Sequence, residues 1–140
     1  MTTAAARHIL VAEDNAVLSN IICFNLKAHG FTVTAAHDGE EAAAYLRRQT
    51  FDLLITDYQM PGLTGADLCA LVREELQNDT LPIIACSAKR LELDTTQFQA
   101  HWKVVQVFSK PFSLRELVRV VAQCLPPSVP AEEACPALSE

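Results

Sequence analysis

Five short apolar runs recur along the chain, and their spacing constrains its fold more than any other feature. The runs occupy residues 8–12, 31–36, 51–57, 82–87 and 104–109. They are continuously apolar rather than alternating in polarity, as expected for strands that are buried on both faces. Segments with helical periodicity separate them, so the sequence predicts a parallel sheet covered by helices.

Three of the intervening segments begin with a pattern typical of a helix N-terminus. A hydroxyl or carboxylate residue precedes an acidic residue by three positions, which resembles a capping box. The pattern occurs at Asp38-x-x-Glu41, Thr64-x-x-Asp67 and Ser113-x-x-Glu116. The helix that begins at Asp38 should be Ala-rich and end near Gln49. A weaker signal lies between the last two runs, where Asp94 is a candidate cap for a short helix carrying Phe98 and Trp102.

Apolar residues at helical spacing indicate which helix faces are buried. The first helix should end at His29-Gly30. The expected buried positions are Leu18, Ile21, Ile22 and Leu26 in the first helix, Leu68, Leu71, Val72 and Leu76 in the third, and Leu114, Leu117, Val118, Val121 and Leu125 in the last.

This alternation predicts one doubly wound α/β domain over residues 7–125, because the crossovers between parallel strands are right-handed. Residues 1–6 would form an N-terminal extension. Residues 126–140 combine Pro126, Pro127, Pro130 and Pro136 with acidic residues. We expect this stretch to be a flexible tail or linker.

Charge and cysteine content exclude several classes of protein. The formal net charge is −6 and no basic stripe is present, so direct nucleic-acid binding is not expected. The five cysteines are scattered and include no Cys-x-x-Cys, which argues against a disulfide framework or a zinc site. The sequence lacks an apolar run of membrane-spanning length and a signal-peptide pattern, so we expect no membrane contact and a cytoplasmic location.

Reactive side chains follow the apolar runs at the points where the strands should end. In an open parallel sheet these carboxyl ends border the ligand site. Three carboxylates crowded there would repel one another and would need a cation to remain ionised. Oxygen ligands in a partly open site favour Mg²⁺. The residues concerned are Glu13, Asp14, Asp57, Ser87 and Lys110.

These groups are the parts needed to transfer a phosphoryl group. A metal ion and Lys110 would offset charge on the phosphoryl oxygens, and the hydroxyl of Ser87 would bond one of them. Asp57 ends the central strand, so its carboxylate is the expected acceptor.

The sequence resembles the receiver domains of two-component response regulators, the chemotaxis-regulator-like or flavodoxin-like fold. The resemblance covers roughly residues 7–125 and implies five parallel strands in the order 2-1-3-4-5. It rests on Glu13-Asp14, Asp57 with Met60-Pro61-Gly62, Ser87-Ala88, and Lys110-Pro111-Phe112, each after an apolar run.

The resemblance implies that Asp57 accepts a phosphoryl group from a histidine kinase or histidine phosphotransfer protein. Mg²⁺ would be held by Glu13, Asp14, Asp57 and the backbone carbonyl of Gln59. Ser87 and Lys110 would contact the phosphoryl oxygens, and the Lys110-Pro111 peptide would be cis. The domain would catalyse only its own phosphorylation and dephosphorylation, and would switch a face that binds an output protein or domain not identified by the sequence.

Two positions depart from the family pattern. Val107 stands where an aromatic switch residue is usual, and Phe108 is the nearest aromatic residue. His101-Trp102-Lys103 replaces the usual Gly-Ala pair before the fifth strand, so Trp102 is either a surface anchor for a partner or packing on a helix face.

Two other functions remain open. A phosphorylation-independent interaction module of the same fold would be marked by loss of Asp57 or Lys110, and both are present. A phosphatase-type hydrolase with an aspartate nucleophile would need a second acid two residues after Asp57, where this chain has Gln59.

Overall fold

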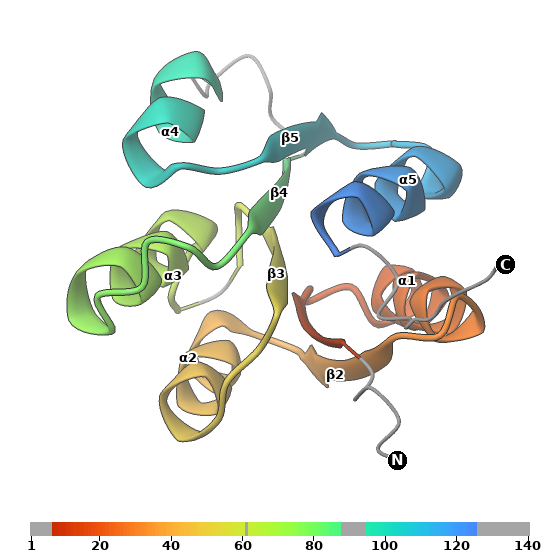
Figure 1. Cartoon of the computed structure of the whole chain (residues 1–140), viewed down its shortest axis with the longest axis horizontal. Helices are drawn as coiled ribbons and strands as arrows, with labels where there is room; N and C mark the ends of the chain where they lie inside the picture. Colours follow the sequence, from red (N-terminus) through yellow and green to blue (C-terminus); the bar gives the residue numbers. More distant parts are fainter. Residues whose placement is uncertain (1–6, 61, 88–94, 126–140) are drawn as a thin grey trace, which may run out of the picture.

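Five parallel strands form a single sheet in the order β2-β1-β3-β4-β5, which confirms the predicted topology (Figure 1). The computed structural model describes residues 7–60, 62–87 and 95–125. Each strand lies inside or coincides with one apolar run. The strands are β1 His8–Ala12, β2 Thr32–Ala36, β3 Leu53–Asp57, β4 Ile83–Ser87 and β5 Gln106–Ser109.

Helices cover both faces of this sheet. The helices α2, α3 and α4 lie on one side and α1 and α5 on the other, so the domain is doubly wound as predicted (Figure 1). None of the helices within the described ranges is long and apolar enough to cross a bilayer. The helices are α1 Ala16–Ala28, α2 Gly39–Arg48, α3 Gly65–Ala70 with the π-helical turn η1 Leu71–Glu75, α4 Thr95–Trp102 and α5 Leu114–Cys124.

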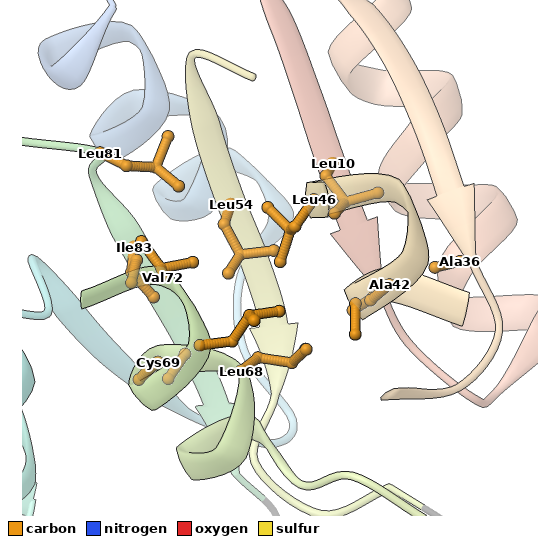
Figure 2. Packing of buried hydrophobic residues seen from close by; sticks show 14 of the residues in the cluster. Leu10, Ala36, Ala42, Leu46, Leu54, Leu68, Cys69, Val72, Leu81 and Ile83 are labelled. Atoms are coloured by element: carbon orange, nitrogen blue, oxygen red, sulfur yellow. The ribbon is translucent and has the colours of Figure 1, made fainter. Parts of the chain in front are cut away.

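Two apolar clusters, one on each face, hold the layers together. Along β1, Leu10 points into the cluster beneath α2, α3 and α4, whereas Ile9 and Val11 point into the cluster beneath α1 and α5. Figure 2 shows Leu54 of β3 surrounded by side chains from α2 and α3 in the first cluster. Both faces of the central strands are therefore dry, which explains why their sequences are continuously apolar.

Three of the predicted N-caps form, although only one of the three is a complete capping box. Thr64 accepts a hydrogen bond from the backbone N–H of Asp67, and the Asp67 carboxylate accepts one from the N–H of Thr64. Asp38 and Ser113 cap α2 and α5 in the same way. Their acidic partners bond elsewhere, Glu41 to the N–H of His37 and Glu116 to the side chain of Arg119.

Two of the expected buried positions are wrong. Leu76 is 38% exposed because η1 is a π-turn, in which the N–H of Leu76 bonds the carbonyl of Leu71, five residues earlier. This wider turn rotates Leu76 away from the face of Val72. Ile21 is 41% exposed, because Ser19, Ile22 and Leu26 already fill the sheet-facing side of α1.

Arg73 in η1 joins three segments through four hydrogen bonds to backbone carbonyls. Its Nε donates to the carbonyl of Trp102 at 2.8 Å, and Nη2 donates to that of Lys103 at 2.9 Å. Its Nη1 donates to the carbonyls of Asn78 at 3.0 Å and Leu81 at 2.9 Å. We call this arrangement the Arg73 clamp. It fixes the C-terminal end of α4 to η1 and to the segment that precedes β4.

Several sequence-based expectations lie outside the described residues. These are the extension at residues 1–6, the tail at residues 126–140, the motif residues Pro61 and Ala88, and the cap Asp94. They remain predictions.

The π-turn gives a direct stability test. Leu68→Ala removes a fully buried side chain and should lower the free energy of unfolding by about 2–4 kcal/mol. Leu76→Ala, at the partly exposed position, should lower it by less than about 1 kcal/mol. Urea denaturation of both variants makes the measurement. Equal losses would mean that Leu76 is buried as in a regular helix.

Candidate functional site

Three carboxylates meet where β1 and β3 end. Glu13 and Asp14 follow β1, and Asp57 is the last residue of β3, the strand between β1 and β4. One oxygen from each carboxylate lies within 4.8 Å of the others. Because neighbouring parallel strands end at the same edge of the sheet, the topology itself brings these acids together.

Lys110, which follows β5, extends its ammonium group into this cluster. Its Nζ lies 3.0 Å from Glu13 Oε1 and 3.2 Å from Asp57 Oδ2. Its backbone N–H donates to the carbonyl of Ser87 at 2.9 Å, and the Lys110-Pro111 peptide is cis, as predicted. One cation is thus shared by two acids at the ends of different strands.

The acids differ in their access to solvent. Glu13 is 2% exposed and Asp57 is 6% exposed, whereas Asp14 is exposed at the rim. The second oxygen of Glu13, Oε2, accepts a hydrogen bond from the N–H of Asn15, which itself caps α1. Glu13 is therefore held inward at the base of the site, and Asp14 faces the side from which a ligand would enter.

The charge balance of the site is unfavourable for an ionised Asp57. Burial, reinforced by the negative charge of Glu13, raises the pKa of Asp57 to about 6 despite the opposing effect of Lys110. Burial alone would lower the pKa of Lys110, but its hydrogen bond to Glu13 and the charges of Asp57 and Glu13 raise it. Lys110 therefore remains protonated, and it does not fully compensate three carboxylates.

This donor set fits a hard divalent cation. The acids of the cluster offer carboxylate oxygens, and one of these acids is open to solvent. The negative charge that Lys110 leaves uncompensated would be neutralised by a bound cation.

Gly65, the first residue of α3, allows that helix to approach the end of β3 closely. A Cβ atom at this position would lie 2.7 Å from the carbonyl oxygen of Asp57 and 2.9 Å from the Cα of Tyr58. The N–H of Gly65 donates to the carbonyl of Tyr58 at 2.8 Å. The contact of Gly65 with the Asp57 backbone becomes evident only in three dimensions.

Ser87 and Gln59 occupy the positions expected of them, but their proposed roles stay predictions. Ser87 ends β4, is 1% exposed and pairs in register with Ser109. The neighbouring Cys86 belongs to the cluster on the α1 and α5 face, as alternation along the strand requires. Gln59 is exposed, two residues after Asp57.

The structure also places the aromatic residues near β5. Val107 packs on the α2, α3 and α4 side, whereas Phe108 packs on the opposite side, 5.6 Å from the ring of Phe112. Phe108 therefore cannot replace an aromatic residue at position 107. Trp102 is half-buried against the first cluster, which fits packing better than an exposed anchor.

One feature beside the site was missed by the sequence analysis. Val17 and Phe24 are 69% and 73% exposed, and with Ile21 they form an apolar ridge along the outer side of α1. A possible signal was the presence of apolar residues on more than one face of the predicted helix. We call these residues the α1 ridge.

Comparison with known proteins settles the family. Residues 9–122 match the profile described as "Response regulator receiver domain". The chain belongs to this family. It is a receiver domain of two-component response regulators, and receiver domains are signalling domains.

Similar proteins agree with this assignment. The phosphate regulon transcriptional regulatory protein PhoB of Rhizobium meliloti (strain 1021) is 37% identical over 117 residues, which cover 84% of this chain and 51% of that protein. The chain thus spans about half the length of this relative.

Two solved structures are similar over nearly their whole length. Chemotaxis response regulator CheY4 of Vibrio cholerae is 25% identical with a TM-score of 0.76, covering 86% of this chain and 100% of that one. The receiver domain of sensor histidine kinase PA1611 from Pseudomonas aeruginosa PAO1 is 29% identical with a TM-score of 0.74, covering 85% and 97%. Its structure has a magnesium ion coordinated in the active site cleft.

The charge imbalance in this receiver domain predicts that Asp57→Asn stabilises the metal-free fold. With the folded-state pKa near 6 and an ordinary value of 3.8, an ionised Asp57 opposes folding at pH 7. The gain should be about 1–3 kcal/mol at pH 7. It should shrink as the pH falls below 6, where the folded wild type takes up the proton.

Urea denaturation in EDTA at pH 7.5 and pH 4.5 measures this difference. Asp67→Asn, at the exposed capping box, is the control and should not stabilise the protein. A loss of stability in Asp57→Asn at pH 7.5 would show that Lys110 compensates the cluster.

Proposed function

We propose that this receiver domain accepts a phosphoryl group on Asp57 from a phosphohistidine of a histidine kinase or histidine phosphotransfer protein. The observation that carries the proposal is the position of the Asp57 carboxylate, at the end of the central strand and 3.2 Å from the Lys110 ammonium. An acid and a fixed cation in one pocket are the minimum needed to receive a phosphoryl group and hold its charge.

The same acids are suited to hold Mg²⁺. Glu13, Asp14 and Asp57 would supply carboxylate oxygens, and the backbone carbonyl of Gln59 would complete the set by resemblance to the family. When bound, Mg²⁺ would offset negative charge on the carboxylates and on the phosphoryl oxygens. The magnesium ion in the PA1611 receiver domain supports this choice.

Each protein group has a separate part in the transfer. A carboxylate oxygen of Asp57 attacks phosphorus as the bond between phosphorus and the donor's imidazole nitrogen breaks. Lys110, already beside Asp57 Oδ2, pairs with a phosphoryl oxygen of the product. The Ser87 hydroxyl, at the end of the adjacent strand, donates to another phosphoryl oxygen. The added charge then shifts the fold between two arrangements that an output protein or domain distinguishes.

The alternatives receive less support from the site. A hydrolase of the aspartate-nucleophile type lacks its second acid, because Gln59 stands two residues after Asp57. A phosphorylation-independent module would have no need to keep Asp57 ionisable beside Lys110 in a buried cluster.

Small phosphodonors test the acceptor assignment. With acetyl phosphate and Mg²⁺, the wild-type chain should gain one phosphoryl group that is stable to acid and labile to base, as an acyl phosphate is. Asp57→Asn should gain none, because its side-chain amide cannot form an acyl phosphate. Intact-protein mass spectrometry reports the product, and EDTA should suppress it.

Asp52→Asn, close to the opposite end of the same strand, is the matched control and should be labelled like wild type. Persistent labelling of Asp57→Asn would place the acceptor elsewhere.

The donor protein has to contact the surface that borders Asp57. The α1 ridge begins at Val17, three residues after Asp14, and runs along α1 to Phe24. This side of α1 carries no acidic residue, so an apolar face on the donor would be complementary to it. We propose that the kinase or phosphotransfer protein docks on this ridge.

Substitution of the ridge should separate docking from chemistry. Val17→Ser with Phe24→Ser should slow transfer from autophosphorylated histidine kinases at least about tenfold, the effect of losing one or two anchors. Labelling by acetyl phosphate should stay at the wild-type rate. Val105→Ser, at a residue that is 40% exposed before β5, is the control. Kinase transfer at the wild-type rate in the double variant would exclude the ridge as the docking surface.

A further inference from the structure

Tyr58, the residue after the acceptor, contacts α4 directly. Its ring meets the ring of Phe98 edge to face, with centroids 5.3 Å apart and an interplanar angle of 84°. Its backbone N–H donates to the carbonyl of Cys86 at 2.7 Å, which fixes Tyr58 between β3 and β4. A displacement of the Asp57 backbone would therefore move a side chain that touches α4.

Phe98 is the main apolar anchor of α4 among its described residues. It is 7% exposed and belongs to the cluster on the α2, α3 and α4 face, whereas its neighbours Gln97 and Gln99 are exposed or half-buried. Val107 of β5 packs against the same cluster without offering a ring. Within the described residues, the Tyr58–Phe98 pair is thus the ring contact between the segment that follows β3 and α4.

The far end of α4 is tied down independently. The Arg73 clamp binds the carbonyls of Trp102 and Lys103, where α4 ends. The N–H of Val104 also bonds the carbonyl of Gln99 at 2.9 Å. A helix that is fixed at one end and contacted near its middle can respond by tilting about the fixed end.

We propose that Tyr58 and Phe98 transmit the state of Asp57 to α4, with the Arg73 clamp holding the C-terminal end of the helix. This inference rests on the proposed function and adds a route for its signal. Tyr58 and Phe98 are positioning residues, since neither reaches the phosphoryl group. An edge-to-face pair contributes enough for its loss to change a conformational equilibrium about two- to tenfold.

Beryllofluoride with Mg²⁺, as a phosphoryl mimic, provides the test on the intact chain. Hydrogen exchange of the α4 peptide should change on addition of beryllofluoride in the wild type. Tyr58→Leu and Phe98→Leu should each reduce that change about two- to tenfold while still binding beryllofluoride. The double variant should lose no more than either single one, because both substitutions remove the same contact. Tyr58→Phe retains the ring and should restore the wild-type response.

Controls separate this route from general destabilisation. Phe108→Leu removes a ring of the pair on the opposite face and should leave the α4 response intact. Urea denaturation of every variant corrects for stability. A wild-type α4 response in Tyr58→Leu, or none in the wild type when beryllofluoride is bound, would overturn the inference. Failure of acetyl phosphate to label Asp57 would instead overturn the proposed function.

Discussion

The contact between Lys110 and two buried acids is the interaction on which the site depends. Glu13 and Lys110 are 97 residues apart in the chain, and their side chains meet only if the four adjacent strands β1, β3, β4 and β5 align. The acids repel one another, so the site does not assemble itself. Burial of the two apolar clusters supplies the free energy that keeps these carboxylates together. The raised pKa of Asp57 shows that their repulsion and burial are not fully compensated. The fold thus holds an excess of negative charge at one edge of its sheet, and a bound cation would neutralise it.

Much of this arrangement could be predicted from sequence because it follows from strand ends. Continuous apolar runs indicate buried parallel strands, and such strands place the residues that follow them at a common edge. Asp14, Asp57 and Lys110 could therefore be grouped before any coordinates were known. The caps at Asp38, Thr64 and Ser113 could also be predicted from the sequence, since a cap depends on residues only three positions apart.

Other features escaped prediction because they depend on packing between distant segments. Helical periodicity assigns Leu76 to the buried face, but the π-turn in η1 changes the phase of the helix there. The exposure of Val17 and Phe24 depends on which side of α1 packs against the sheet. Likewise, the Tyr58–Phe98 contact joins the segment after β3 to a helix residue 40 positions later, and no local sequence pattern predicts it. The absence of an aromatic residue at Val107 was visible in the sequence, whereas the alternative ring contact was not.

The Arg73 clamp has a consequence for sequence divergence within this fold. All four of its acceptors are main-chain carbonyls, at Asn78, Leu81, Trp102 and Lys103. Every residue type has such a carbonyl, so the clamp places no chemical demand on the side chains at these four positions. Exposed side chains around the end of α4 can therefore change to suit a new partner while the clamp keeps the backbone beneath them in the same conformation. Arginine itself is not replaceable in this way, because a lysine ammonium lacks the planar array of donors that reaches four carbonyls at once.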